Sequence, residues 1–269
     1  MAFKSQTWMI GCGNMGRAMI EGWRLAGFDF AGLTVIRPSG TEVEGVRVVG
    51  DADAAGSAPN LVILAVKPQQ LDEVASDLRP RLSAQTVVVS LLAGVELASL
   101  RERFPGVRTI VRAMPNLPVA VRRGVIPMIG ESEDQAVKVA VAELFQPLGY
   151  APWMVDEEKL AAASSVSGAG PAYVARFIAA LTRAGEAQGL STEMAATIAL
   201  ETVFGTAWMA AGSGEAMDDI AGRVASPKGT TEAGLEVLDR DGVFNDLVSV
   251  AIAAARRRGE ELAKAAKAS

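Results

Sequence analysis

The sequence predicts an α/β fold in two domains: residues 1–155 form a parallel β-sheet covered by helices, and residues 156–269 form helices alone. Two observations carry this prediction. Up to about residue 155, short and continuously apolar runs alternate with helical stretches, which is typical of parallel strands buried on both faces. Beyond it, apolar side chains recur at helical spacing and no strand-like run occurs.

The N-terminal elements follow from this alternation. The first strand, Trp8–Ile10, ends at a glycine, and a helix is expected over Asn14–Ala26. Lys67-Pro68 ends the fourth strand, because proline cannot continue the hydrogen-bond ladder. The remaining strands are expected at Leu33–Ile36, Val46–Val49, Leu61–Val66, Thr86–Ser90 and Thr109–Val111, with a helix over Glu96–Phe104.

The C-terminal helices are expected over Pro171–Gly189, Thr192–Ala211, Thr231–Asp239 and Phe244–Lys264. Alanine, glycine and serine are abundant in them, which permits close packing but leaves few bulky side chains for a separate core. We expect such helices to bury their apolar faces against a second copy of the chain, so this domain is predicted to dimerise.

The composition of the chain limits its possible binding partners and its cellular compartment. With 269 residues, a net charge of −5, a pI of about 5.0 and no basic stripe, the chain is a poor match for nucleic acid or an anionic membrane. Its one cysteine, Cys12, allows no intrachain disulfide. Met1–Thr7 has no long apolar segment, and we find no 18-residue apolar run. The sequence therefore predicts a cytoplasmic protein.

The chain contains no histidine. This excludes Ser–His hydrolases, histidine-dependent hydride transfer and histidine-rich metal sites, and we expect no metal. Any proton transfer has to use a carboxylate, lysine, tyrosine, hydroxyl, water or the substrate's own proton.

A glycine-rich turn follows the first strand. Gly11-Cys12-Gly13-Asn14-Met15-Gly16 has the G-x-G-x-x-G spacing. The first glycine permits a tight turn, the second lets a pyrophosphate approach the backbone, and the third allows close packing of helix on strand. Because the motif directly follows a strand and opens a helix, it predicts a Rossmann-type dinucleotide-binding domain. Cys12 is interpreted as a small residue of the turn rather than a nucleophile.

The end of the second strand bears on the choice of cofactor. An Asp or Glu here usually binds the free ribose 2′-hydroxyl of NAD, whereas arginine and hydroxyl donors suit the 2′-phosphate of NADP. This chain has Arg37 and Ser39. The pair favours NADPH, with NADH as an alternative, and an ordinary solvated charge is the other interpretation of Arg37.

Further segments follow strands at the carboxyl edge of the sheet, where ligands bind in open α/β folds. Two of them are Ala65-Val66-Lys67-Pro68 and Ser90-Leu91-Leu92-Ala93-Gly94. Lys67 is interpreted as a solvated or cofactor-facing charge rather than a catalytic acid. Arg112–Pro118 places Asn116 at the polar tip of a rigid loop, which either contacts substrate or only forms a turn.

Two loops belong to the second domain. Ser165–Tyr173 is a Gly/Ser-rich turn with Pro171 at a helix start, which either caps that helix or lines a site. Ser226-Pro227-Lys228-Gly229-Thr230-Thr231 combines structure-breaking residues with two threonine hydroxyls directly before a helical run. Such a loop directs backbone N–H groups and a hydroxyl at a small anion, which predicts a binding site for an acid.

Taken together, these segments resemble the pyrroline-5-carboxylate reductase family. The resemblance covers nearly the whole chain and rests on six segments in register: Gly11–Gly16, Ala65–Pro68, Ala93–Val95, Met114–Asn116, Ser167–Tyr173 and Ser226–Thr231. It implies an N-terminal Rossmann domain and a C-terminal helical dimerisation domain. It also implies reduction of the cyclic imine 1-pyrroline-5-carboxylate to L-proline by NAD(P)H, the last step of proline biosynthesis. The family's assembly implies a homodimer or a ring of dimers, with each site completed by both subunits.

The resemblance also assigns roles to single residues. Thr231 corresponds to the threonine whose hydroxyl bonds the ring nitrogen, and it is the expected catalytic residue. The substrate carboxylate is expected at the backbone of Gly229, Thr230 and Thr231. Ser226 and Asn116 are expected as further substrate-binding residues. The expected cofactor-binding residues are Ile10, Gly11, Cys12, Gly13, Asn14, Met15, Gly16, Arg37, Ser39, Val66, Lys67, Pro68 and Ala93.

Two positions depart from the family's pattern. Lys228 stands where family members usually carry a small residue, most often glycine. A glycine indicates close approach or positive φ, so the lysine must either fit an ordinary backbone conformation or bring an ammonium near the carboxylate. Ala52 stands where an asparagine often meets the adenosine side of the cofactor.

The expected mechanism suits a chain without histidine. Hydride transfer depends on positioning, and an imine that binds already protonated needs no strong protein acid. Two other functions stay open. One is a β-hydroxyacid dehydrogenase, which would need a catalytic lysine in the helical domain; the other is a non-catalytic NADP-binding sensor. The lysines of that domain are Lys159, Lys228, Lys264 and Lys267.

Overall fold

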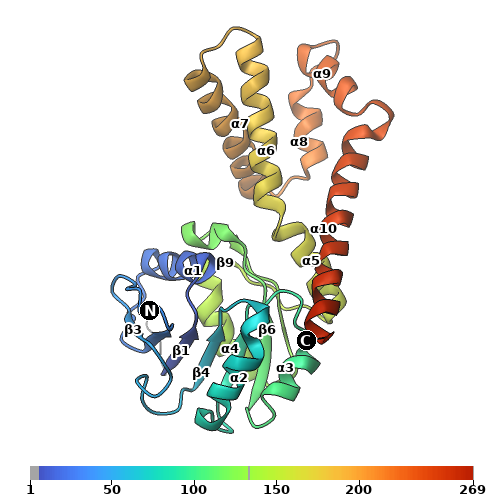
Figure 1. The fold of residues 1–269 in the computed structure, drawn as a ribbon. Coiled ribbons are helices and arrows are strands. Elements are labelled where there is room, and N and C mark those ends of the chain that lie inside the picture. Colours follow the sequence, from blue (N-terminus) through green and yellow to red (C-terminus); the bar gives the residue numbers. More distant parts are fainter. Residues whose placement is uncertain (1–5, 133, 269) are drawn as a thin grey trace. The chain divides into compact units, whose positions relative to one another are not determined.

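The computed structural model of the protein describes residues 6–132 and 134–268, so Met1–Ser5 of the N-terminal stretch lie outside the described residues. The chain divides into two compact units (Figure 1). The first comprises the chain up to Ala169 together with the stretch from Ala255 onward, and the second comprises Gly170–Ala254. Helix α5 (Glu157–Ser167) and the end of α10 (Val243–Ala268) thus group with the first unit, although the sequence suggested a division at residue 155.

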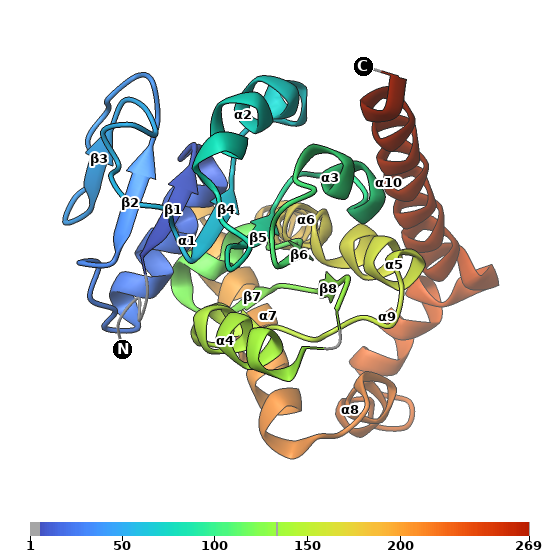
Figure 2. The same cartoon turned by 90° about the horizontal axis from the view of Figure 1, so that it is seen from below.

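The first unit is built on a seven-stranded sheet in the order β3-β2-β1-β4-β5-β6-β8 (Figure 2). The predicted parallel strands are present, and β4 ends at Leu64 rather than at Val66. The last strand, β8 (Met128–Gly130), pairs antiparallel with β6 and was not expected. The parallel strands are β1 (Thr7–Ile10), β2 (Leu33–Ile36), β3 (Arg47–Val49), β4 (Leu61–Leu64), β5 (Val87–Ser90) and β6 (Thr109–Ala113). Two short strands, β7 (Gly124–Val125) and β9 (Gly149–Tyr150), pair separately.

Helices cover both faces of this sheet, as the continuously apolar strands predicted (Figure 2). On one face lie α1 (Asn14–Leu25) and α4 (Gln135–Phe145), and on the other lie α2 (Leu71–Leu78) and α3 (Leu97–Arg103). Each face has its own core of buried side chains. Burying one large apolar side chain stabilises the fold by about 1.5–3 kcal/mol. The indole N–H of Trp23 donates to the carbonyl of Leu144 at 2.8 Å and links α1 to α4.

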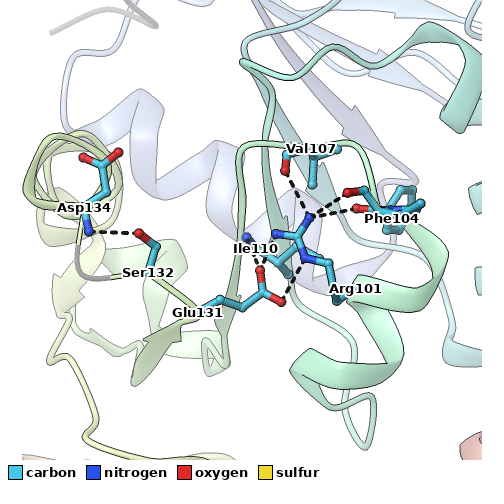
Figure 3. Close-up of polar contacts among 8 residues, drawn as sticks. Arg101, Phe104, Val107, Ile110, Glu131, Ser132 and Asp134 are labelled. Carbon is cyan, nitrogen blue, oxygen red and sulfur yellow. Dashed lines mark hydrogen bonds and ion pairs between the residues drawn. The ribbon is translucent and has the colours of Figure 1, made fainter.

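A polar network fastens α3 to the edge of the sheet (Figure 3). The guanidinium of Arg101 donates to the carbonyl of Val107 at 3.0 Å and forms an ion pair with Glu131 at 2.5 Å. Glu131 follows β8, and its carboxylate also accepts the N–H of Ile110 on β6 at 3.1 Å. One arginine therefore holds together the end of a helix and two neighbouring strands.

The second unit contains helices alone (Figure 1). They are α6 (Gly170–Ala187), α7 (Thr192–Ser213), α8 (Met217–Val224), α9 (Thr230–Leu238) and the first part of α10. The helices predicted here are confirmed, while α8 was not expected. Ser165–Ser167 belong to α5, so the predicted Gly/Ser turn is reduced to Gly168–Ala169. Within this unit, Ala195, Ala199 and Ile220 are the buried apolar residues among those the structure describes.

Candidate active site

The carboxyl ends of the parallel strands meet at one edge of the sheet in the first unit. The chain order reverses between β1 and β4, which makes the crevice beside β1 the switch point at which such sheets bind ligands. The N–H of Gly11 donates to the carbonyl of Ile36 at 2.8 Å, and the N–H of Ala65 donates to the carbonyl of Ile10 at 2.8 Å. These bonds place the glycine-rich turn beside the end of β2 and the segment after β4.

The three glycines of the turn occupy three different environments. Gly11 has φ +79°, and a Cβ there would lie 2.8 Å from Cγ1 of Val66 and 3.0 Å from the carbonyl oxygen of Ala65. An ideal Cβ on Gly13 would meet nothing within 4 Å. A Cβ on Gly16 would lie 3.3 Å from two sulfur atoms of the core. This geometry fits a tight turn, an accessible approach to the backbone for pyrophosphate, and close helix packing.

Arg37 follows β2, and one nitrogen of its guanidinium is buried. Its Nη1 is buried and makes no hydrogen bond within the described residues. Burial raises the pKa of the Cys12 thiol, and the positive charges of Arg37 and Arg17 oppose that rise, so both guanidinium groups lie within electrostatic reach of the turn. A buried N–H without an acceptor fits an anionic group, and Arg37 therefore suits the 2′-phosphate of NADP. Sequence reasoning missed Arg17, because it lies just outside the glycine pattern.

The other predicted cofactor residues lie around the same edge. Leu91 after β5 donates its N–H to the carbonyl of Leu64 at 3.0 Å, which keeps the segments after β4 and β5 side by side. Ala52 is buried in the core and offers no polar group to a cofactor. Among the predicted residues, Ile10 and Cys12 are buried, Met15, Val66 and Pro68 are half-buried, and Asn14, Ser39, Lys67 and Ala93 are exposed. Their contacts with a cofactor stay predictions.

Asn116 already has structural partners. It is 6% exposed, its Oδ1 accepts the N–H of Val125 at 2.8 Å, and its Nδ2 donates to the carbonyl of Ser167 at 2.9 Å. Ser167 is the last residue of α5, so this amide ties the loop after β6 to the end of that helix. One N–H of the amide is left for another acceptor, and substrate binding by Asn116 stays a prediction.

The beginning of α5 is held by a partly buried ion pair. Arg112, 8% exposed at the end of β6, donates from Nη1 to Oε1 of Glu157 at 2.6 Å. The same oxygen accepts the N–H of Leu97, the first residue of α3, at 3.0 Å. Sequence reasoning missed Glu157, because nothing local in its segment marks it as the partner of Arg112.

In the second unit, the loop before α9 forms a tight turn. The N–H of Gly229 donates to the carbonyl of Ser226 at 2.9 Å, Pro227 is the second residue of the turn, and Lys228 is the third, with φ +59°. This is the pattern of a type II turn, whose third position favours glycine. A Cβ on Gly229 would lie 2.4 Å from Oγ of Ser226. Lys228 therefore adopts a conformation that costs an L-residue about 1–2 kcal/mol.

The turn leads directly into the N-terminus of α9. Gly229 is the residue before the helix, and no side chain caps it. Thr230 and Thr231 are the first two helical residues, whose N–H groups have no partner inside a helix. Thr231 is half-buried, and its hydroxyl makes no hydrogen bond within the described part of the chain. The hydroxyl of Thr231 is therefore available to a ligand.

Comparison with known proteins shows which family the chain belongs to. Residues 157–262 match the family model described as pyrroline-5-carboxylate reductase dimerisation, and residues 8–94 match the NADP oxidoreductase, coenzyme F420-dependent, model. The pyrroline-5-carboxylate reductase of Pseudomonas aeruginosa is 36% identical over 263 residues, covering 95% of this chain and 96% of that protein. The chain belongs to the pyrroline-5-carboxylate reductase family. This confirms the resemblance and the predicted fold class.

Solved reductases of the family have the same fold. The pyrroline carboxylate reductase of Plasmodium falciparum, solved with NADP bound, superposes with a TM-score of 0.87 at 26% identity, covering 98% of this chain and 100% of that one. The pyrroline-5-carboxylate reductase of Coxiella burnetii gives a TM-score of 0.86 at 31% identity, covering 96% of this chain and 98% of that one. Both units of this chain thus have counterparts in known reductases.

Substitutions of two of the three glycines in the turn, Gly11 and Gly13, are expected to differ in their effect on stability. Gly11→Ala is expected to lower the free energy of unfolding by about 1–3 kcal/mol, because its Cβ meets Val66 and its φ is positive. Gly13→Ala is expected to leave it within about 0.5 kcal/mol. Both are expected to raise the Kd of NADPH at least about tenfold in titrations by fluorescence. Unimpaired NADPH binding by the Gly13 variant would remove the turn from the cofactor site.

Because Lys228 has a positive φ, a glycine at this position is expected to raise the stability of the protein and a valine to lower it. Lys228→Gly is expected to raise the free energy of unfolding by up to about 1 kcal/mol, because relief of the positive φ exceeds the entropy that glycine adds to the unfolded chain. Lys228→Val is expected to lower it by about 1–3 kcal/mol, because a β-branched residue resists this conformation. Urea unfolding at a fixed protein concentration measures both. Equal stability of the two variants would show that residue 228 has ordinary backbone angles in solution.

Proposed function

We propose that the protein reduces 1-pyrroline-5-carboxylate to L-proline, the last step of proline biosynthesis, with NADPH as hydride donor and NADH as an alternative. Family membership over 95% of the chain supports this activity. The single structural observation that carries it is the end of the loop Ser226–Thr231. There the N–H groups of Thr230 and Thr231 and the hydroxyl of Thr231 make no hydrogen bond within the described residues.

The first unit supplies the cofactor side of the reaction. NADPH, when bound, donates a hydride to the imine carbon. The turn Gly11–Gly16 would hold its pyrophosphate, since the backbone N–H groups at the start of α1 are accessible beside Gly13. Arg37 would hold its 2′-phosphate, which supplies an acceptor for the buried Nη1. The preference for NADPH over NADH follows from that guanidinium.

The second unit supplies the substrate side. The N–H groups of Thr230 and Thr231 carry the positive end of the α9 dipole, which suits the substrate carboxylate. The hydroxyl of Thr231 would accept the N–H of the protonated imine and orient the ring. Because the imine binds with its proton in place, the reaction needs no protein acid, in keeping with the absence of histidine.

Residues 156–269 are proposed to act as the substrate-binding and dimerisation domain, although α5 and the end of α10 pack in the first compact unit. The match of residues 157–262 to the dimerisation model supports this. Large apolar side chains lie exposed on α7, among them Phe204 (60%) and Trp208 (59%), whose rings stack at 6.2 Å. By length and composition alone α7 could also cross a membrane, which the sequence analysis did not expect. We propose that a second copy of the chain covers it, in a homodimer or a ring of dimers.

Location and the remaining partners belong to the same proposal. An acidic chain with a pI of about 5.0 and no basic stripe is expected to bind neither nucleic acid nor anionic membrane and to work in the cytoplasm.

The alternative function, a β-hydroxyacid dehydrogenase, would need a catalytic lysine in the helical domain. Lys159, Lys228 and Lys264 are exposed, and the side chain of Lys267 lies outside the described residues.

The activity is tested by following cofactor oxidation with 1-pyrroline-5-carboxylate, and cofactor reduction with 2-hydroxy acids as the competing reaction. We expect oxidation with both cofactors, faster with NADPH, and no reduction with 2-hydroxy acids. Turnover of the hydroxy acids alone would make the protein a dehydrogenase, and binding of cofactor without any turnover would make it a sensor.

Thr231 is expected to affect turnover rather than cofactor binding. Thr231→Ala should lower kcat about 10–1000-fold, the effect of one positioned polar group, and leave the Kd of NADPH unchanged. Thr231→Ser keeps the hydroxyl and should retain most of the activity. Steady-state kinetics with a parallel NADPH titration measures both, and wild-type kinetics in the alanine variant would exclude Thr231 from the mechanism.

The exposed face of α7 predicts an oligomer that one charge disrupts. Trp208→Glu is expected to convert the oligomer to smaller species, because a carboxylate is costly to bury between apolar surfaces. Val139→Glu on α4 is a matched control, since Val139 is 56% exposed in the first unit. Light scattering after gel filtration gives the masses. Dissociation by both variants, or by neither, would contradict the assignment of the interface to α7.

A further inference from the structure

Two arginines beside the glycine-rich turn lack the carboxylate partners that other arginines of the first unit have. The Nη1 of Arg37 is buried and unpaired, and the exposed side chain of Arg17 makes no hydrogen bond or ion pair within the described residues. Other arginines of this unit pair with carboxylates, among them Arg24, Arg81, Arg101, Arg103, Arg108 and Arg112. The unpaired state of Arg17 and Arg37 is therefore not a general property of arginines here.

The backbone brings the two arginines to the same turn from different elements. Arg37 directly follows Ile36, whose carbonyl accepts the N–H of Gly11 at 2.8 Å. Arg17 lies in the first turn of α1, and its N–H bonds the carbonyl of Gly13 at 3.0 Å. Both charges oppose the rise that burial causes in the pKa of the Cys12 thiol, and no carboxylate is among the causes of that shift. Two positive charges therefore lie within electrostatic reach of the turn, in a chain whose net charge is −5.

The chemistry of such a pair is that of a phosphate site. A phosphate monoester carries a charge of roughly −1.5 to −2 at pH 7 and offers three acceptor oxygens, more than one guanidinium satisfies. The pyrophosphate of a dinucleotide already has backbone N–H groups at the start of α1. The anionic group left for the arginines is the 2′-phosphate on the adenosine ribose.

We propose that Arg17 and Arg37 together bind the 2′-phosphate of NADPH, which makes Arg17 a second residue that determines cofactor specificity. The proposal rests on the use of NADPH proposed above. Arg37 approaches the phosphate from the end of β2 and Arg17 from α1, so that each guanidinium donates to different phosphate oxygens. NADH has no group for Arg17 to bind, and its affinity is independent of that residue.

Calorimetric titration with four ligands tests this without any turnover: NADPH, NADH, 2′,5′-ADP and 5′-AMP. In Arg17→Gln we expect the Kd of NADPH and 2′,5′-ADP to rise about 10–100-fold, the scale of charge-assisted hydrogen bonds to one phosphate. The Kd of NADH and 5′-AMP should change less than about threefold. Arg24→Gln is the matched control on the same helix: it removes an equal charge, but from an arginine already paired with Glu21, and should leave all four Kd values unchanged.

The other outcomes overturn the proposal. Equal weakening of NADPH and NADH would place Arg17 at the pyrophosphate, and unchanged affinities would make it a solvated charge. Arg17→Lys keeps the charge without the planar fork and should fall between wild type and Arg17→Gln. If the protein binds 2′,5′-ADP through Arg17 but does not reduce the imine, the proposed function fails and this inference stands.

Discussion

The chain has no room for a side chain at the point where β1 turns toward α1. The atoms nearest to a Cβ on Gly11 belong to Ala65 and Val66, which follow the neighbouring strand β4. Any Cβ would push the turn away from β4 and disturb the hydrogen bonds that join the strand ends. The close approach therefore fixes three things together: the path of the chain into α1, the accessible backbone at Gly13, and the position of Arg17 in the first turn of the helix.

The end of β6 and the loop that follows it have an analogous role for α5. Arg112 of β6 pairs with Glu157 at the start of that helix, and Asn116 of the loop bonds the carbonyl of Ser167 at the end. Breaking a fully buried ion pair costs about 3–5 kcal/mol, and this pair costs less because the Glu157 side chain is 32% exposed. Losing a neutral hydrogen bond costs about 0.5–1.5 kcal/mol. The end of β6 and the loop after it thus hold both ends of the helix that precedes the second unit. A segment interpreted as a substrate contact has at least this structural role.

The sequence predicted those features that depend on residues close together in the chain, and it missed features that depend on distant residues. Continuously apolar strands and strong helical periodicity gave most elements to within a few residues. By contrast, α5 and β8 were not predicted. Helix α5 buries only Leu160 among its described residues and so lacks an apolar stripe, and β8 has only three residues, Met128–Gly130. The glycine turn and the threonine loop were predicted because backbone requirements leave a sequence pattern. Glu157 and Arg17 were not, because their importance depends on which charges the fold brings near them.

Lys228 shows how far such a pattern determines a conformation. The sequence offered an ordinary backbone or an ammonium near the carboxylate, but the lysine instead adopts the positive φ that a glycine would take. Its neighbours explain why. Pro227 fixes the second position of the turn, and Gly229 must stay beside Ser226, where a Cβ has no room. In the type II turn that they form, the residue between them takes a positive φ. The cost of about 1–2 kcal/mol is small enough for the surrounding structure to bear, so a lysine can replace a glycine here without changing the turn that presents Thr231.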